Sequence, residues 1–251
     1  MIGATPDDWF VPTSPRPHAN LTVFAYPQAG GGCTAFSPQA RTMPDWLEMA
    51  TLSLPGRQAR FDEPLCTDLE ELTSRLVEYC AKHAGPFMFF GYCAGALLAY
   101  SVASGLQAEG LPMPERLVVG SFLPPHRAAA TISFADLDSE TFWKILVDNN
   151  AISPDLAAHA DLRDLSEPAI RADMALTAGY KNVSRPPLKI PITLLTGERD
   201  EWLASGDAQG WADYTSAVFD VRMLPAGHWF MEEDPVASVA ALVEVAEEIR
   251  R

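Results

Sequence analysis

The residues Gly91–Gly95 read Gly-Tyr-Cys-Ala-Gly, a spacing that places a nucleophile between two glycines. Cysteine attacks carbonyl carbon as a thiolate, and glycines two positions to either side permit a sharp turn from a strand into a helix. An apolar run, residues 86–90, precedes the motif, and a stretch of small helix-forming residues follows it. The helix N-terminus would then lie beneath the sulfur and favour its charged form. The motif therefore predicts a nucleophile at Cys93.

A cysteine nucleophile needs a base, and the base needs a group that orients it. His228 follows the last expected strand, and Asp200 follows the strand before it. Cys93, Asp200 and His228 occur in the chain order nucleophile, acid, histidine that is typical of the α/β-hydrolase fold. The sequence thus predicts a catalytic triad of these three residues. Glu198 and Glu201 flank Asp200 and are alternative acids.

A run of glycines follows the first expected strand, in the loop 27–33. Backbone N–H groups of such a loop can approach the negative charge that develops on a carbonyl oxygen under attack. We expect the amides of Ala29 and Ala94 to form this oxyanion hole, since Ala94 directly follows the nucleophile. The glycine spacing matches neither a dinucleotide-binding fingerprint nor a P-loop, which argues against a phosphate-binding role.

Strands and helices alternate along the chain, and this alternation predicts the scaffold. Apolar, β-rich runs predict strands over residues 21–26, 51–54, 86–90, 116–123, 190–195 and 219–224. A helical period covers residues 68–83, with Asp68 as its N-cap. This order predicts an α/β fold with a mainly parallel sheet and helices on both faces, in which ligands bind beyond the carboxyl ends of the strands.

The stretch 128–187 interrupts the alternation with short helical segments and no convincing strand. It predicts a helical lid inserted between two strands of a single domain that spans residues 1–251. The length of 251 residues, with 48% hydrophobic and 20% charged residues, suits one large domain with a full core. This composition excludes a disordered or fibrous chain.

The charge balance and the cysteines exclude further classes of function. A net charge of −15 argues against binding to a nucleic-acid backbone. No run of about 18 apolar residues predicts a membrane span, and the N-terminus has no signal pattern, so we expect a cytoplasmic protein with no membrane partner. The cysteines form no C-x-x-C pair, and no cluster has metal-ligand spacing. We therefore expect no metal and no other cofactor.

With these features the chain resembles the type II, stand-alone thioesterases that accompany polyketide synthases and nonribosomal peptide synthetases. The likeness rests on residues 24–31, 54–60, 91–95 and 227–230, and on 171–173 as the end of that family's lid. It implies hydrolysis of acyl groups from the phosphopantetheine arm of an acyl or peptidyl carrier protein, as in antibiotic biosynthesis. We expect a monomer.

Two residues depart from the family's pattern: Cys93 stands where the family usually has serine, and Gln28 where it usually has histidine. An acyl-enzyme on sulfur is itself a thioester, so its transfer to another acceptor competes with hydrolysis. A cysteine-dependent acyltransferase or cyclase, which passes the acyl group to an acceptor other than water, is therefore an alternative function. A non-catalytic binding module with the hydrolase fold is a second alternative.

Aromatic and basic residues are candidates for substrate and carrier contacts. The candidate substrate-binding residues are Gln28, Phe134, Phe142, Trp143 and Trp229. Ordinary core packing is the alternative role for those in the expected lid. Carrier proteins of this kind are typically acidic, so an acidic enzyme needs a local basic patch to receive one. The candidates for this patch are Arg57, Arg60, Lys181 and Arg185, with plain solvent exposure as the alternative.

Overall fold

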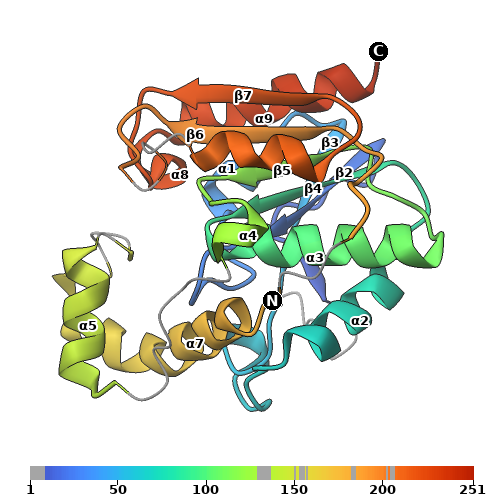
Figure 1. Cartoon of the computed structure of the whole chain (residues 1–251). Coiled ribbons are helices and arrows are strands. Elements are labelled where there is room, and N and C mark those ends of the chain that lie inside the picture. The colour runs from blue at the N-terminus through green and yellow to red at the C-terminus, as the bar shows by residue number, and fades with distance from the viewer. Residues whose placement is uncertain are drawn as a thin grey trace.

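A seven-stranded sheet forms the centre of the protein. The structure is a computed structural model that describes residues 9–128, 137–149, 151–152, 156, 158–181, 185–201, 203 and 207–251. Within these residues the strand order is β1-β3-β2-β4-β5-β6-β7. The strands are β1 (Phe10–Pro12), β2 (Leu21–Tyr26), β3 (Leu47–Leu52), β4 (Phe87–Tyr92), β5 (Leu117–Gly120), β6 (Ile192–Gly197) and β7 (Phe219–Leu224). Only β1 pairs antiparallel, so the predicted α/β fold with a mainly parallel sheet is confirmed (Figure 1).

Helices cover both faces of this sheet. The helices outside the segment between β5 and β6 are α1 (Ser37–Thr42), α2 (Leu69–Cys80), α3 (Ala94–Glu109), α8 (Phe230–Glu233) and α9 (Pro235–Ile249), with two 3₁₀ helices, η1 (Gln58–Arg60) and η2 (Asp207–Tyr214). Phe24 and Tyr26 of β2 pack with α2 and α3, whereas Val23 and Ala25 pack with α1 and α9. Alternate side chains of one strand thus fill two separate halves of the core.

Local signals explain where two of the helices begin. The Asp68 side chain accepts hydrogen bonds from the amides of Glu70 and Glu71, which confirms it as the N-cap of α2. Helix α3 begins at Ala94, immediately after Cys93, and ends at Gly110 in the left-handed conformation. The candidate nucleophile therefore lies at the junction of β4 and α3.

The observed strands differ from the expected ones in their bounds and in their number. The strand expected at 51–54 is β3, which begins at Leu47 and ends at Leu52. Its Leu-Glu-Met-Ala run favours a helix in isolation, but parallel pairing with β2 overrides that preference. The strand expected over 116–123 ends at Gly120, because Ser121 has a φ of 46° and leaves the extended conformation. The sequence does not predict β1, a short edge strand that contains Pro12.

Between β5 and β6 the described chain contains α4 (Pro125–Ala128), α5 (Ser139–Asp148) and α7 (Ala160–Ala178). Helix α7 contacts α3, and α5 stands farther from the sheet (Figure 1). The interpretation of residues 128–187 as a lid within one domain stays a prediction. None of the helices that the structure describes is long and apolar enough to cross a membrane.

Candidate active site

Cys93 occupies a strained turn at the end of the central strand β4. Its φ of 51° and ψ of −130° are unusual for a residue with a side chain, and its amide donates to the carbonyl of Gly120 at 2.8 Å. A Cβ on Gly91 would lie 2.4 Å from the Cα of Ala96, and a Cβ on Gly95 would lie 2.3 Å from the carbonyl oxygen of Tyr26. Both glycines are therefore required, as the nucleophile-elbow spacing predicts.

His228 and Asp200 form a buried pair at the ends of neighbouring strands. His228 Nδ1 lies 3.2 Å from Asp200 Oδ2, and both residues are buried. Glu198 and Glu201, the alternative acids, are exposed. Asp200 is thus the acid that the structure places against the imidazole.

Backbone contacts hold the loops that carry these two residues. The amide of Glu198 donates to Leu224 at 2.8 Å, and the amide of Arg199 donates to Ala226 at 3.0 Å. A Cβ on Gly197 would lie 2.2 Å from the carbonyl oxygen of Gly227, so only glycine permits this close approach. The positions of Asp200 and His228 are therefore coupled through main-chain contacts.

The environment of His228 favours the protonated imidazole. Burial alone lowers the pKa of His228, but hydrogen bonding to Asp200 and to Cys93, with the electrostatic attraction of both groups, raises it to about 10. Cys93 is therefore close enough to His228 to interact with it. The predicted nucleophile, base and acid come together from the ends of β4, β7 and β6.

Two side chains that the sequence did not single out, those of Tyr92 and Glu232, lie beside the histidine. The hydroxyl of Tyr92 donates a hydrogen bond to the carbonyl of His228 at 2.9 Å. Glu232 Oε2 lies 3.2 Å from the same hydroxyl oxygen. Burial raises the pKa of Glu232 to about 7, against the lowering effects of its hydrogen bonds and of His228. Trp229, a candidate substrate contact, is buried and packs edge-on against the His228 ring at 5.1 Å between centroids.

The loop after β2 approaches the nucleophile from the other side. Gly95 lies against the carbonyls of Tyr26 and Pro27, which brings this loop to the N-terminus of α3. Ala29 and Ala94 line the same cavity. Across the described chain no backbone partner occupies the amide of either alanine. Both expected oxyanion donors are thus adjacent to the elbow.

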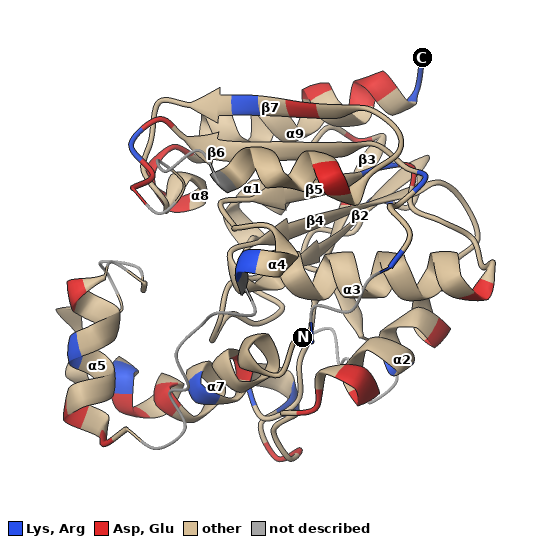
Figure 2. Ribbon diagram, viewed as in Figure 1, with Lys and Arg blue, Asp and Glu red and all other residues tan. Residues whose placement is uncertain are grey.

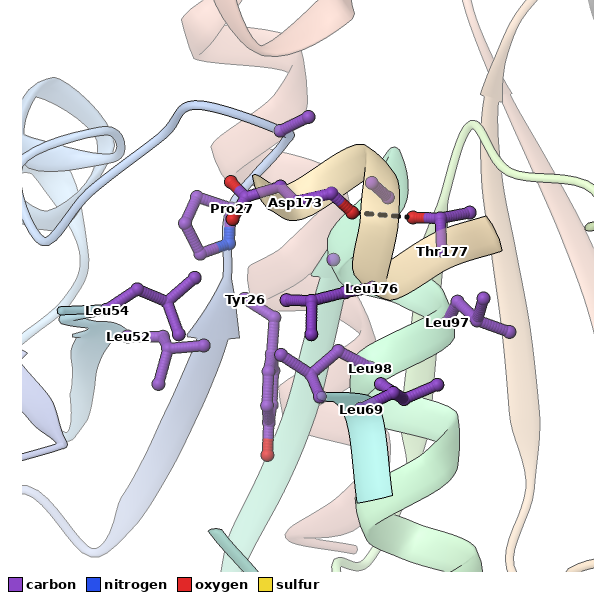
Figure 3. A pocket seen from close by; sticks show the side chains of 13 residues that line it. Tyr26, Pro27, Leu52, Leu54, Leu69, Leu97, Leu98, Asp173, Leu176 and Thr177 are labelled. Atoms are coloured by element: carbon purple, nitrogen blue, oxygen red, sulfur yellow. Dashed lines mark hydrogen bonds between the residues drawn. The ribbon is translucent and has the colours of Figure 1, made fainter. Parts of the chain in front are cut away.

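A small apolar cavity of about 30 Å³ adjoins the two alanines. Leucine side chains from several elements surround it, and Tyr26 forms part of its wall (Figure 3). The leucines are Leu52, Leu54, Leu69, Leu97, Leu98 and Leu176. Asp173 and Thr177 are the polar members of this otherwise apolar lining.

None of the other candidate substrate contacts that the structure describes lines this cavity. Phe142 and Trp143 belong to a buried cluster with Leu146, Ile152 and Ile170, and Trp143 Nε1 donates to Glu167 at 2.6 Å. Gln28 Oε1 is buried, and no described atom bonds to it. Phe134 lies outside the described residues. The substrate-binding roles of these residues stay predictions.

Two members of the expected basic patch are not available for docking. Arg57 and Arg60 are 7% and 6% exposed. Arg57 pairs with Asp173 at 2.6 Å, and Arg60 pairs with Glu63 at 2.6 Å. The prediction that these arginines form a docking surface is wrong, because buried guanidinium groups are bound to carboxylates of the same chain. Lys181 and Arg185 are exposed.

Among the described residues, no three His, Cys, Asp or Glu side chains lie close enough together to hold a metal ion. Fold and site define an α/β-hydrolase with an elbow cysteine beside a histidine–aspartate pair. The model of the thioesterase domain family matches residues 21–248, and the chain belongs to this family. It is therefore a thioester hydrolase.

Individual relatives agree with this assignment. The chain is 30% identical to the medium-chain S-acyl fatty acid synthase thioesterase of Homo sapiens over 86% of this chain and 83% of that protein. It is 28% identical to the gramicidin S biosynthesis protein GrsT of Aneurinibacillus migulanus over 90% of this chain and 88% of that protein. The solved structure of BorB, the type II thioesterase of the borrelidin biosynthetic cluster, superposes with a TM-score of 0.85 at 26% identity, covering 96% and 98% of the two chains.

Proposed function

We propose that the protein hydrolyses acyl thioesters from the phosphopantetheine arm of a carrier protein in polyketide or nonribosomal peptide biosynthesis. Cys93, His228 and Asp200 form the catalytic triad. The observation that carries the proposal is the buried Asp200–His228 pair, 3.2 Å apart, beside a cysteine in the nucleophile elbow. The likeness to GrsT and BorB, whose names place them in biosynthetic pathways, supports the setting.

Acylation begins with attack of the Cys93 sulfur on the thioester carbonyl carbon. A bond forms between Cys93 Sγ and this carbon, and the amides of Ala29 and Ala94 stabilise the resulting oxyanion. The bond from carbon to the pantetheine sulfur then breaks, and His228 gives its proton to the departing thiolate. Asp200 orients the imidazole throughout.

Deacylation uses the neutral His228 that acylation leaves behind. The imidazole removes a proton from water, and the hydroxide attacks the acyl carbon. The bond to Cys93 Sγ breaks, the carboxylic acid leaves, and the proton on His228 restores the starting pair. The raised pKa of His228 favours the protonated state at the start of each cycle.

The cavity next to the alanines holds the start of the acyl chain in this proposal. Its leucine lining excludes charged acyl groups, and its small volume favours short ones. The carrier protein docks through exposed basic side chains, of which Lys181 and Arg185 remain candidates. Basic side chains also occur on α4, α5 and α7, on the last two helices among acidic ones (Figure 2).

The cysteine itself favours one alternative, acyl transfer or cyclisation. A thioester-linked acyl-enzyme is close in energy to its thioester substrate, so an amine, alcohol or thiol acceptor competes with water. The two functions share every step up to the acyl-enzyme. They differ only in the released product.

Intact-mass measurement with product analysis tests these functions. Wild-type protein and Cys93→Ala are mixed with an acyl-carrier protein and, separately, with an acyl-N-acetylcysteamine thioester. We expect a transient acyl mass on the wild type and free acid in solution, with turnover by Cys93→Ala about 10⁴-fold lower or worse. Cys66→Ala, which replaces a half-buried cysteine outside the oxyanion loop, is the matched control and should turn over normally.

Each other outcome identifies another function. An adduct that persists in water and leaves only with an added amine, alcohol or thiol would identify a transferase or cyclase. Absence of adduct and of turnover in the wild type would identify a binding module. Normal turnover by Cys93→Ala would exclude Cys93 as the nucleophile. A Lys181→Glu/Arg185→Glu variant that loses activity on the carrier but keeps it on the small thioester would locate the docking surface.

A further inference from the structure

A carboxylate from helix α7 holds the oxyanion loop from outside. Asp173 Oδ2 accepts a hydrogen bond from the amide of Gly30 at 2.7 Å, although the two residues are 143 positions apart in the chain. The same oxygen accepts from Arg57 Nη1 at 2.6 Å, and Oδ1 accepts from Arg57 Nη2 at 2.8 Å. Arg57 Nη1 also donates to the carbonyl of Gly31 at 3.1 Å. Three distant segments thus meet at one carboxylate.

These contacts fix the relative positions of α7, the loop after β2 and the loop after β3. Arg57 and Asp173 are both buried, and a two-pronged guanidinium–carboxylate pair is strong and directional. The pairing also neutralises a negative charge that would otherwise oppose an oxyanion nearby. Asp173 lines the cavity together with Ala29 and Ala94, so this charge lies at the site itself (Figure 3).

Packing of α7 and its neighbours adds to the hydrogen bonds. Gly30 has a φ of 77°, and a Cβ there would lie 2.5 Å from Cγ1 of Ile170, one turn before Asp173 on α7. Ala29 packs against the buried cluster that contains Ile170 and Phe142. The loop itself contributes a turn bond from the amide of Gly31 to the carbonyl of Gln28 at 2.9 Å. Helix α7 therefore provides much of the packing and hydrogen bonding that fix the conformation of this loop.

The constraint reaches Ala29 through the backbone. The Gly30 amide that binds Asp173 belongs to the peptide unit that joins Ala29 to Gly30. Because Arg57 fixes the carbonyl of Gly31, the peptide units that follow Ala29 are held on both sides. The Ala29 amide shares its planar peptide unit with the Gln28 carbonyl, which accepts from the Gly31 amide at 2.9 Å, so the direction of the Ala29 amide is restricted as well.

We propose that Asp173 and Arg57 are positioning residues that couple the seating of α7 to the assembly of the oxyanion hole. This inference rests on the proposed function, in which the Ala29 amide is an oxyanion donor. When α7 packs against the oxyanion loop, Asp173 binds the Gly30 amide and the oxyanion hole has both of its donors. When α7 moves away, the loop loses its partner and the hole loses a donor. The nucleophile, His228 and Asp200 do not depend on this contact.

Two reactions of the same cysteine test the coupling. Acylation by an acyl-N-acetylcysteamine thioester needs the oxyanion hole. Alkylation by iodoacetamide does not, because the sulfur–carbon bond forms as iodide leaves and no carbonyl oxyanion develops. Both rates are measured at Cys93 by peptide mass for the wild type and for Asp173→Asn. The asparagine keeps the shape but turns an N–H₂ group toward donors that need an acceptor.

For Asp173→Asn we expect acylation to fall about 10- to 100-fold, mainly in kcat rather than KM, because a donor displaced by about 1 Å costs that much. Alkylation of Cys93 should stay within about twofold of the wild type. Asp164→Asn, the same substitution at an exposed position of α7, should leave both rates unchanged. Arg57→Lys, which keeps the charge but not the two-pronged geometry, should give an intermediate loss and serves if Asp173→Asn does not fold.

The results separate the two proposals. A wild type that acylates and an Asp173→Asn variant that acylates equally fast would overturn the coupling and leave the proposed function intact. A parallel loss of acylation and alkylation would also overturn it, since the effect would then lie on the nucleophile. A wild type that forms no acyl adduct would overturn the proposed function and the coupling together.

Discussion

The two halves of the candidate site are held in different ways. Cys93 directly follows β4, Asp200 lies three residues after β6 and His228 four residues after β7, and main-chain hydrogen bonds join the loops that carry the last two. The oxyanion loop also follows a strand, but a buried ion pair from α7 and the loop after β3 holds its far end. The sheet therefore determines the nucleophilic half, whereas the electrophilic half depends on side chains brought from elsewhere.

The two halves of the site therefore have different structural supports. Hydrogen bonds join the parallel strands β4, β5, β6 and β7, so the proposed proton-transfer groups lie at the ends of paired strands. In the proposed coupling, stabilisation of the oxyanion depends on α7. This helix belongs to the predicted lid between β5 and β6, through which substrate is expected to enter. The predictions below perturb each half in turn, or the contact between them.

The largest effect is expected in the strand-anchored half. Asp200→Asn should reduce kcat on the order of 10³- to 10⁴-fold, because the amide cannot orient the imidazole or stabilise its charge. Steady-state hydrolysis of an acyl-pantetheine thioester measures this, and Glu198→Gln in the same turn is the matched control with normal activity. Activity of Asp200→Asn near the wild-type level would show that another group fills this role.

A substitution at the contact between the two halves should damage both. Gly95→Ala would place a Cβ 2.3 Å from the carbonyl oxygen of Tyr26 and 2.4 Å from that of Pro27, and both are main-chain atoms that cannot turn aside. We expect a loss of about 3 kcal/mol in the free energy of unfolding. Activity should fall on the order of 10²-fold, because the start of α3 and the oxyanion loop are forced apart.

Urea unfolding and thioester hydrolysis measure the two effects. Gly110→Ala is the control, since no atom lies within 4 Å of its added Cβ. Its φ of 67° alone should cost about 1 kcal/mol and leave activity unchanged. Equal destabilisation by the two substitutions would mean that the contact at Gly95 is not tight.

The same division decides what could be predicted from the sequence. Cys93, Asp200 and His228 each follow an apolar run closely, so local patterns locate them and chain order assigns their roles. The choice of Asp200 over Glu198 could not be read from spacing. It depends on a turn in which the amide of Asp200 bonds to Gly197, and only the folded backbone displays that turn.

In the other half the glycine run predicts the oxyanion loop, but no local pattern predicts the ion pair that holds it. Arg57 and Asp173 are 116 residues apart, and neither lies in a periodic segment that would mark its partner. An arginine in a loop between glycine and glutamine is ordinarily exposed, so the sequence makes Arg57 a candidate for a docking surface. Long-range pairing of charged side chains follows from the tertiary fold, and a single sequence does not record it.

A smaller effect is expected at the cavity beside Ala29. Leu176→Ala removes a wall that α7 contributes, so acyl chains a few methylene groups longer should fit. The ratio of kcat/KM for a longer chain to that for a shorter one should rise about 10-fold. Competition between octanoyl and acetyl thioesters measures this ratio. Leu165→Ala, an exposed leucine on the same helix, should leave it unchanged.

An unchanged ratio in Leu176→Ala would mean that acyl chains bind outside this cavity. A ratio that changes equally in both variants would indicate a general effect on α7. Either result would separate the role of this helix in positioning Gly30 from any role in chain-length selection.

The last prediction concerns the dependence of stability on pH. The pKa of His228 is raised to about 10 in the folded protein, against about 6.5 for an ordinary histidine. The folded state therefore binds this proton more tightly than the unfolded chain does. The resulting stabilisation is complete below about pH 6.5 and is lost as the pH rises toward 10.

Urea unfolding of the wild type and of His228→Gln at a series of pH values measures this contribution. The advantage of the wild type should shrink steadily from pH 6.5 to pH 10. A constant difference would mean that the imidazole carries no extra proton in the folded state, and His228 would then have to act from its neutral form. Addition of Asp200→Asn should flatten the slope, since Asp200 supplies part of the attraction, whereas Glu198→Gln should not. That contrast would place the proton in the half of the site that the sheet holds.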